Sequence, residues 1–407
     1  MRGAGDQLSV GERIAFYRRR RGLAQGTLAA LMGRSEDWLS KIERGERQLQ
    51  KIELAVEMAR HLRVTLGDLL GQPVLVEDPQ DPAGEDIPAI RDALMSPRRL
   101  SRMLYGQRDG LPPATGHTRV LTEMVWSDFQ KGLIGSVVQA LPGLIQTAQA
   151  LEERDDVPER WAISARVHHL AASTLSKVGE GDLAWLAAER AMYAADQADD
   201  PLVLASAARA GTHALLAAGR YDDALDLGST AADYLCRQMR EDDPNALSLL
   251  GMLHLRTGVA AARHDDRSTA TENLRRAEAL SAELGEDGNY WQTSFGPTNV
   301  ELHQLSAALD LGDVVYVVER APRVDVGAMP VERAVSHGID SAKALSLVAE
   351  DDSALELLLD AETRAPQLVR HSAVVREMVK AMQRRSPVTG QAPSSPLMAL
   401  AERCRAV

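Results

Sequence analysis

Apolar residues recur at helical spacing near the N-terminus of the chain. Leu28, Ala29 and Met32 lie on one face of a predicted helix, and Leu39 and Ile42 lie on one face of the next. Spacings of three and four residues are typical of amphipathic helices, whose apolar faces pack against each other. The pattern therefore predicts two short helices that cross over a shared core.

The breaks between these helices carry residues that suit tight turns. Gly33 can adopt a positive φ at little cost, and Ser35 is a good N-cap for the second helix. Gly45 suits the left-handed position that ends this helix. Because Ala29 is small enough for two helices to approach closely, residues 25–44 are predicted to form a helix-turn-helix.

Further helices complete the predicted module. One spans about residues 10–21 with Ile14 and Tyr17 inward, another spans about residues 51–62, and a short one spans about residues 66–70. The pattern thus predicts five helices in the first seventy-one residues.

The sequence GLAQGTLAALMGRSEDWLSKIERGER, residues 22–47, resembles the phage-repressor-like (Xre) DNA-binding family. The resemblance implies an Xre-type domain over residues 1–71, whose helix from Ser35 to Glu43 enters the major groove of double-stranded DNA. It also implies a buried ion pair between Arg18 and Glu43. Xre modules usually act as dimers on inverted repeats, so a homodimer is expected.

The resemblance places four side chains of this helix near base edges: Glu36, Asp37, Ser40 and Lys41. Ser35, at the start of the helix, is a further expected DNA contact. Lys41 can donate to guanine, and Glu36 or Asp37 can accept from cytosine N4. Both acids also occupy the first turn of a helix, where negative charge favours the positive end of the dipole. For the acids, base contact and dipole stabilisation remain alternatives.

Candidate phosphate contacts flank the same helix at Gln25, Arg34, Arg44 and Arg47. Such contacts fix the position of a protein on DNA rather than its sequence preference. The alternative for each arginine is a solvated surface position. Trp38 is expected to pack against the helix.

Charge divides the chain in the same place. Residues 1–71 contain 13 lysine and arginine and 9 aspartate and glutamate residues, a net charge of +4, against −12 for the whole chain. Residues 72–407 therefore carry −16. A basic module on an acidic body suits a protein of which one part alone approaches phosphate.

Prolines and acids mark two non-globular segments. Residues 72–118 are predicted to be an acidic, proline-rich linker with a short helix at PAIRDALM, residues 88–95. Residues 386–407 are expected to be a flexible tail.

Residues 119–385 contain an imperfect repeat of helix pairs. In its clearest unit, residues 208–235, Gly219 separates two helical patterns, and Tyr221 and Ala224 pack the second onto the first. Related patterns recur at a wider spacing than the roughly 34 residues of a tetratricopeptide repeat. The fold class expected for the whole chain is therefore all-α.

FGPTNVELH, residues 295–303, and APQLVRHSAVVREMV, residues 365–379, resemble stretches of the tetratricopeptide-like sensor domains that follow Xre modules in actinobacterial regulators. The resemblance implies a solenoid whose concave face is a natural site for a peptide, a small molecule or a protein. The candidate ligand contacts are Arg166, Trp291, Asn299 and His303. The alternatives are a helix cap for Asn299, a satisfied core histidine for His303 and a gap filler for Trp291.

Other functional classes find little support. The sequence lacks a glycine-rich phosphate loop, an HExxH motif and a CxxC pair, so an enzyme, a metal site or a cofactor is not expected. Its two cysteines suit a reducing cytosol. With no run of about 18 apolar residues and no signal-peptide core, a cytoplasmic protein without a membrane partner is expected.

These patterns predict a sequence-specific transcriptional regulator whose DNA binding is modulated by a ligand or partner of the repeat domain. The alternative is an interaction scaffold whose helix-turn-helix docks protein, and the acids Glu36 and Asp37 favour it. The operator sequence and the direction of regulation stay open.

Overall fold

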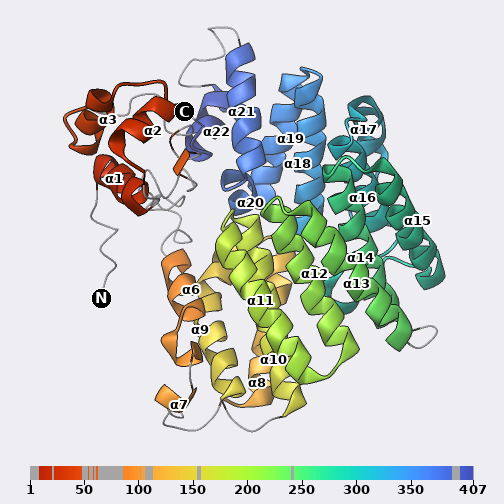
Figure 1. The fold of residues 1–407 in the computed structure, drawn as a ribbon. Helices are drawn as coiled ribbons and strands as arrows, with labels where there is room; N and C mark the ends of the chain where they lie inside the picture. Colours follow the sequence, from red (N-terminus) through yellow and green to blue (C-terminus); the bar gives the residue numbers. More distant parts are fainter. Residues whose placement is uncertain are drawn as a thin grey trace. The chain divides into compact units, whose positions relative to one another are not determined.

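The computed structural model describes the chain in two compact units, Met1–Gly84 and Glu85–Val407. Every regular element in the described parts of the chain is a helix (Figure 1). The described residues are 9–20, 23–47, 54, 58, 61–62, 86–100, 102–105, 113–153, 157–239, 243–386 and 395–406.

The first unit contains three described helices around one small core. They are α1 (Val10–Arg20), α2 (Gln25–Leu31) and α3 (Glu36–Glu43), and α3 packs against both of the others. The core consists of apolar residues from all three helices, joined by Met58 and Leu62. Two further helices are expected from the sequence, at residues 51–62 and 66–70, and most of their residues lie outside the described ones.

Local sequence explains how α3 is held. Gly33 lies in the turn before α3 at a φ of +62°, where a side chain would be strained. The Ser35 hydroxyl then caps α3 by accepting from the Trp38 N–H at 3.2 Å. On the opposite side, a side chain at Gly11 would collide with the backbone oxygen of Ile42, so α1 and α3 pack backbone to backbone.

The second unit is a stack of antiparallel helices, most of which pack against the next one along the chain. Its elements are α6 (Asp86–Leu94), η2 (Pro97–Leu100), α7 (Arg102–Tyr105), α8 (Thr115–Gln130), α9 (Ile134–Glu152), α10 (Pro158–Lys177), α11 (Gly181–Ala198), α12 (Pro201–Ala217), α13 (Tyr221–Gln238), α14 (Pro244–Arg263), α15 (Arg267–Leu284), η3 (Tyr290–Gln292), α16 (Pro297–Asp310), α17 (Val314–Arg320), η4 (Ala321–Arg323), α18 (Val331–Leu347), α19 (Asp351–Arg364), α20 (Pro366–Arg370), α21 (Ala373–Arg385) and α22 (Pro396–Arg403).

Three successive helix pairs share the same start signal. Pro158, Pro201 and Pro244 are the first residues of α10, α12 and α14, and they lie 43 residues apart. Proline suits the first helical position because its missing N–H would have no intrahelical partner there. Asp200 and Asp243 cap two of these helices by accepting backbone N–H groups. The repeat expected from the sequence is therefore visible as a helical-repeat region.

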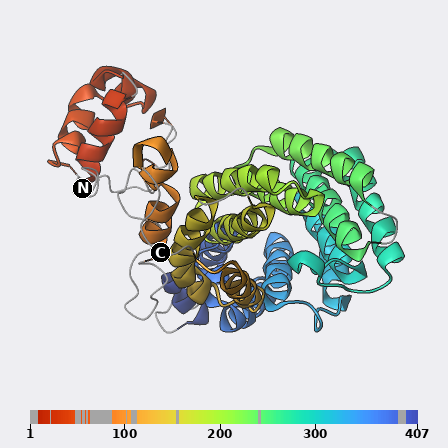
Figure 2. The ribbon, with the colours of Figure 1, turned by 90° about the horizontal axis from the view of Figure 1, so that it is seen from below.

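The first helices of the pairs form an inner layer. Along it α8 packs against α10, α10 against α12, α12 against α14, α14 against α16 and α16 against α18. Helix α18 also packs against α8, and α20 packs against α9, so the inner layer closes into a ring. Figure 2 shows the helices of this unit curving until the C-terminal ones return to α8.

The repeat region begins earlier than residue 119. Helix α6 packs against α9 and α11, and its residues Ile87, Ile90 and Leu94 are buried. The expected short helix is thus part of the helical body. This corrects the expectation of a linker for residues 86–94, because three apolar residues at helical spacing give α6 a face to bury. Residues 72–85 of the expected linker lie outside the described residues.

The C-terminal residues 395–406 also belong to the body. Helix α22 packs against α21, and its Leu400 and Ala401 are buried. The Arg403 guanidinium pairs with Glu362 at 2.6 Å, and Arg376 donates to the backbone oxygen of Cys404 at 3.1 Å. This corrects the expectation of a flexible tail for residues 395–406.

Candidate nucleic-acid interface and ligand cavity

Helix α3 has a core face and a solvent face. Trp38, Leu39, Ile42 and Glu43 are buried against the rest of the first unit. Most of the candidate DNA contacts lie on the solvent side: Arg34, Ser35, Glu36, Asp37, Lys41, Arg44 and Arg47 are exposed, and Ser40 is half-buried. The structure therefore presents the expected base-reading helix to solvent and buries Trp38 as expected.

A buried ion pair ties α3 to α1. Arg18 donates from Nε to Glu43 Oε1 at 2.6 Å and from a terminal nitrogen to Glu43 Oε2 at 2.9 Å. The hydrogen bonds to Glu43 raise the pKa of Arg18. Arg18 also donates to the backbone oxygen of Leu23 at 2.8 Å, which fixes the start of the helix-turn-helix.

Gln25 belongs to the same network. Its side-chain amide donates to Glu43 Oε2 at 2.7 Å. From the sequence, the Gln25 side chain is expected to contact the DNA backbone. In the structure it donates to the second oxygen of the buried Glu43 carboxylate. A buried carboxylate needs such partners because its charge is otherwise poorly solvated.

Two cations of the solvent face are paired with nearby acids. Lys41 contacts Asp37 at 2.7 Å within α3, and Arg44 contacts Glu46 at 2.9 Å. Exposed pairs of this kind contribute about 0.5 kcal/mol, so phosphate or a base can displace them at little cost. Asp37 therefore holds Lys41 in the DNA-free protein.

Two of the four expected ligand contacts lie together in the second unit. The Arg166 guanidinium lies 5.1 Å from the centre of the Trp291 ring and pairs with Glu123 at 2.6 Å. Arg166 also donates to Gln292 at 2.7 Å. We call residues 290–295 the strap, because Gln292 of this segment is held by Glu123 of α8, Arg166 of α10 and Arg209 of α12.

The other two, Asn299 and His303, are buried in α16 beneath the strap. Asn299 donates to the backbone oxygen of Thr293 at 3.2 Å, and His303 Nδ1 lies 2.8 Å from the backbone oxygen of Asn299. Burial and the positive charge of Arg333 keep the pKa of His303 well below its ordinary value. Asn299 holds the strap and His303 contacts the backbone of its own helix, and neither side chain lines the cavity described next.

The inner layer encloses a small cavity of about 40 Å³. Side chains of α8, α10, α12, α14, α18 and the strap line this inner cavity. Four of them are basic, Lys177, Arg209, Arg256 and Arg333, and one, Glu332, is acidic. A closed ring of helices thus surrounds a strongly basic interior.

One of the four cations has a carboxylate partner. Lys177 pairs with Glu332 at 2.5 Å and donates to the Ser336 hydroxyl at 2.9 Å. Burial raises the pKa of Glu332, but Lys177 and Arg333 outweigh it and the pKa falls well below its usual range. The positive charge of Lys177 on α10 and the negative charge of Glu332 on α18 therefore neutralise each other.

The positive charges of the three arginines are not neutralised by any carboxylate that the structure describes. Within the described ranges, no carboxylate lies at ion-pair distance from Arg209, Arg256 or Arg333. Burial and the neighbouring Arg333 lower the pKa of Arg209 and of Arg256 to about 9. The neighbouring guanidiniums therefore repel one another.

His169 orients Arg209 inside this cavity. Arg209 lies 3.3 Å from His169 Nε2, and His169 Nδ1 lies 2.9 Å from the Ser206 hydroxyl. Since a guanidinium can only donate, His169 accepts at Nε2 and carries its proton on Nδ1. Burial, then Arg209, keep the pKa of His169 well below its ordinary value.

The strap has a strained backbone where it meets the inner cavity. Trp291, Gln292 and Ser294 have φ values of +53°, +51° and +49°. Residues other than glycine rarely adopt such angles, and strain of this kind concentrates at ligand-binding segments. Gln292 and Ser294 line the cavity.

The basic residues of the inner cavity escaped the sequence analysis, although the repeat contains a signal for them. Arg209 follows Arg166 by one 43-residue period, and Arg256 follows His213 by the same interval. Such polar residues occupy equivalent places on helices that are otherwise lined by small apolar side chains. Aligning the repeats would have identified Arg209 and Arg256.

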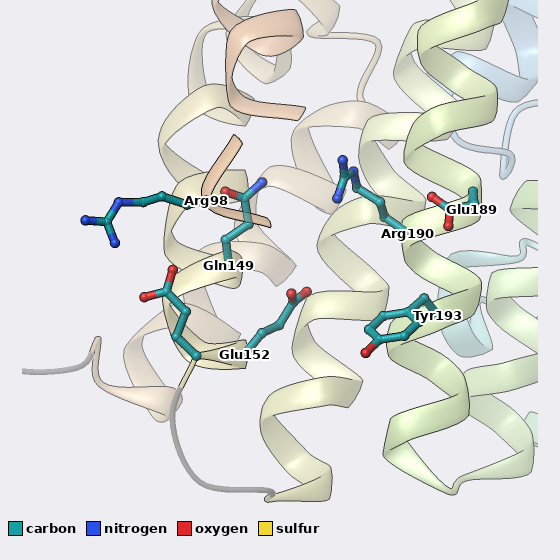
Figure 3. Close-up of a pocket in the computed structure, with 7 residues that line it drawn as sticks. Arg98, Gln149, Glu152, Glu189, Arg190 and Tyr193 are labelled. Atoms are coloured by element: carbon teal, nitrogen blue, oxygen red, sulfur yellow. The ribbon is translucent and has the colours of Figure 1, made fainter. Parts of the chain in front are cut away.

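A second, larger cavity of about 310 Å³ lies between α9, α11 and η2. It is lined by Arg98, Gln149, Glu152, Glu153, Glu189, Arg190 and Tyr193. Figure 3 shows Glu152 pointing from α9 toward α11, whereas Arg98 points away. Ser164 donates to Glu152, and Gln149 donates to the backbone oxygen of Ala93 at 2.8 Å. Charges of both signs line this cavity, so it favours no single class of ligand.

Across the described parts of the chain, no group of three or more histidine, cysteine, aspartate or glutamate side chains is arranged to hold a metal ion. Among the helices that the structure describes, none combines the length and apolar character needed to cross a membrane.

Comparisons with known proteins bear on the first unit most directly. A search of curated protein sequences finds no match. Among solved structures, Bacillus thuringiensis PlcR in complex with the peptide PapR7 and DNA is 14% identical, covering 68% of this chain and 95% of that one at a TM-score of 0.28. Aspartyl phosphate phosphatase F from Bacillus subtilis is 14% identical, covering 92% and 97% at a TM-score of 0.45. Residues 9–70 match a family described as a helix-turn-helix domain.

Proposed function

We propose that the protein is a sequence-specific DNA-binding transcriptional regulator whose helical-repeat unit holds a ligand that modulates DNA binding. The observation that carries the proposal is the solvent face of α3, which presents polar and basic side chains within a segment that matches a helix-turn-helix domain. This role is one of binding and not of catalysis.

In the proposed complex α3 enters the major groove. Lys41 leaves Asp37 to donate to a base, and Ser40 lies one position before it on the helix. Arg34, Arg44 and Arg47 contact phosphates and fix the register of the helix. Each phosphate contact that is formed releases counterions, so affinity falls steeply with salt concentration.

Selection of bound sequences from random DNA, followed by fluorescence anisotropy on the selected site, tests this proposal. We expect a specific site whose affinity has a steep salt dependence, and Lys41→Ala combined with Arg44→Ala should abolish specific binding. Arg275→Ala is the matched control, because Arg275 is an exposed arginine of α15 that pairs with Glu272. If no complex survives competitor DNA, the proposal is wrong.

We further propose that two copies of the chain bind an inverted repeat. Helix-turn-helix dimers place their half-sites about one helical turn apart, roughly 34 Å. A footprint with two half-sites at that spacing, and two chains per duplex in sedimentation, would support the dimer.

One observation favours a second candidate function. Glu36 and Asp37 are both exposed at the start of α3, where they repel phosphate. They suit a helix-turn-helix that docks a basic protein, with the repeat unit as a scaffold. Co-purification of a stoichiometric protein partner, together with the lack of any DNA footprint, would select this alternative.

A further inference from the structure

We propose that the inner cavity of the helical-repeat unit binds a compact anionic group, a carboxylate or a phosphate, held by Arg209, Arg256 and Arg333. The inference rests on the proposed function only in one respect, namely that this anion is the ligand that modulates DNA binding. The binding site itself is argued from the second unit alone.

The first argument is charge. Arg209, Arg256 and Arg333 line one cavity, and Lys177 with Glu332 is already neutral as a pair. Burying like charges together is costly unless an opposite charge compensates them. Within the described residues no further carboxylate lines this cavity, so a bound anion is the group that would offset the repulsion.

The second argument is the supply of hydrogen-bond donors. Arg256 Nε is buried and donates to no group in the structure. Guanidinium groups recognise carboxylate and phosphate through two parallel hydrogen bonds, which few other donors can provide. Ser173 adds a hydroxyl group to the same lining. The lining therefore offers an anion more donors than acceptors.

The third argument is size. About 10–15 Å³ of such space holds one water molecule, so a cavity of about 40 Å³ has room for about three or four water-sized atoms, such as the oxygens of a carboxylate or a phosphate. A carboxylate or a phosphate group has this size, whereas a whole peptide does not. A larger ligand would reach the cavity only with an anionic end group.

The position of the arginines suggests how binding changes the protein. Arg209 and Arg256 belong to α12 and α14, whereas Arg333 belongs to α18, which closes the ring. An anion that contacts all three arginines therefore connects α18, which closes the ring, to α12 and α14. Ligand binding therefore strengthens the closed ring and orders the strained strap, which is a change that a DNA-binding unit on the same chain can sense.

Calorimetric titration of the full-length chain with inorganic phosphate, at constant ionic strength, tests the inference. We expect saturable binding and a rise of the unfolding temperature with phosphate. Arg256→Gln and, independently, Arg333→Gln should weaken phosphate binding at least tenfold. Arg275→Gln, on the exposed face of α15, should leave it unchanged.

A second readout separates an anion site from a merely structural role. Without phosphate, Arg256→Gln should keep or raise the unfolding temperature, because it removes one of three repelling charges. If both variants keep the affinity of the wild-type protein, or if the wild-type protein shows no saturable binding of either phosphate or acetate, the inference is wrong.

Two further probes distinguish a free anion from an anionic end group. Tri-alanine with a free carboxylate should bind more tightly than acetate if the natural ligand is a chain that ends in the cavity, and amidated tri-alanine should not bind. Equal affinity of acetate and tri-alanine would indicate a free small anion. Because these titrations contain no DNA, loss of phosphate binding overturns this inference alone, and loss of DNA binding in phosphate-free buffer overturns the proposed function alone.

Discussion

Arg18 and Glu43 lie 25 residues apart in the chain and are joined by two hydrogen bonds of 2.6 and 2.9 Å between α1 and α3. Both side chains are nearly buried, so each charge depends on the other for its solvation. The pair therefore holds the helix that carries the DNA contacts, although neither residue needs to touch DNA.

Breaking this pair should destabilise the first unit strongly. Glu43→Gln leaves the Arg18 guanidinium buried without a counter-charge, and we expect a loss of about 3–5 kcal/mol. Hydrogen exchange of the amides in α1 and α3 measures this locally, without requiring the whole chain to unfold in one step. Arg44→Gln breaks an exposed pair and should cost about 0.5 kcal/mol. Equal protection in both variants would contradict the role of the pair.

Removing Asp37 should strengthen binding to DNA. Asp37→Asn frees Lys41 and removes a negative charge that would face phosphate. We expect non-specific affinity to rise by at most about tenfold, equivalent to about 1.4 kcal/mol, and the salt dependence to become steeper. Fluorescence anisotropy on random duplex DNA measures both, with Asp352→Asn in α19 as a control on an exposed acid of the other unit. An unchanged affinity would mean that Asp37 lies away from the DNA.

Acid should destabilise the second unit through its buried histidines. His169 and His303 have pKa values well below the ordinary value of about 6.5, because burial and nearby arginines oppose their protonation. Below pH 6.5 the unfolded chain takes up protons that the folded one does not, so stability falls as pH falls. Each histidine contributes about 1.4 kcal/mol per pH unit in this window. Urea unfolding at pH 7.5 and 5.5 measures the loss, and His303→Gln should reduce it.

The sequence predicted local structure well and long-range closure poorly. Gly33, Ser35 and the apolar spacing define the helix-turn-helix because each acts within a few residues. The pairing of α18 with α8 joins segments about 200 residues apart, and no local signal specifies it. Gln25 shows the same limit at a single residue, because its amide meets a carboxylate 18 positions away.

The C-terminal helix should contribute measurably to stability. Leu400 is fully buried beside α21, so Leu400→Ala is expected to cost about 2–4 kcal/mol through lost burial and a residual cavity. Leu347→Ala offers a matched control, since Leu347 is 60% exposed at the end of α18. Thermal unfolding compares the two. If both substitutions lower the unfolding temperature equally, α22 is not packed as described.

Arg166 should influence the affinity of the inner cavity although its side chain does not line it. Its guanidinium contacts Glu123 and Gln292 at once and covers Trp291, so it holds the strained strap in place. Arg166→Lys keeps the positive charge but loses the planar fork that makes these contacts. We expect faster hydrogen exchange in residues 290–295 and a several-fold loss of phosphate affinity. Arg119→Lys, at an exposed pair with Glu159, should change neither. Faster exchange with unchanged phosphate affinity would show that the strap is not part of the anion site.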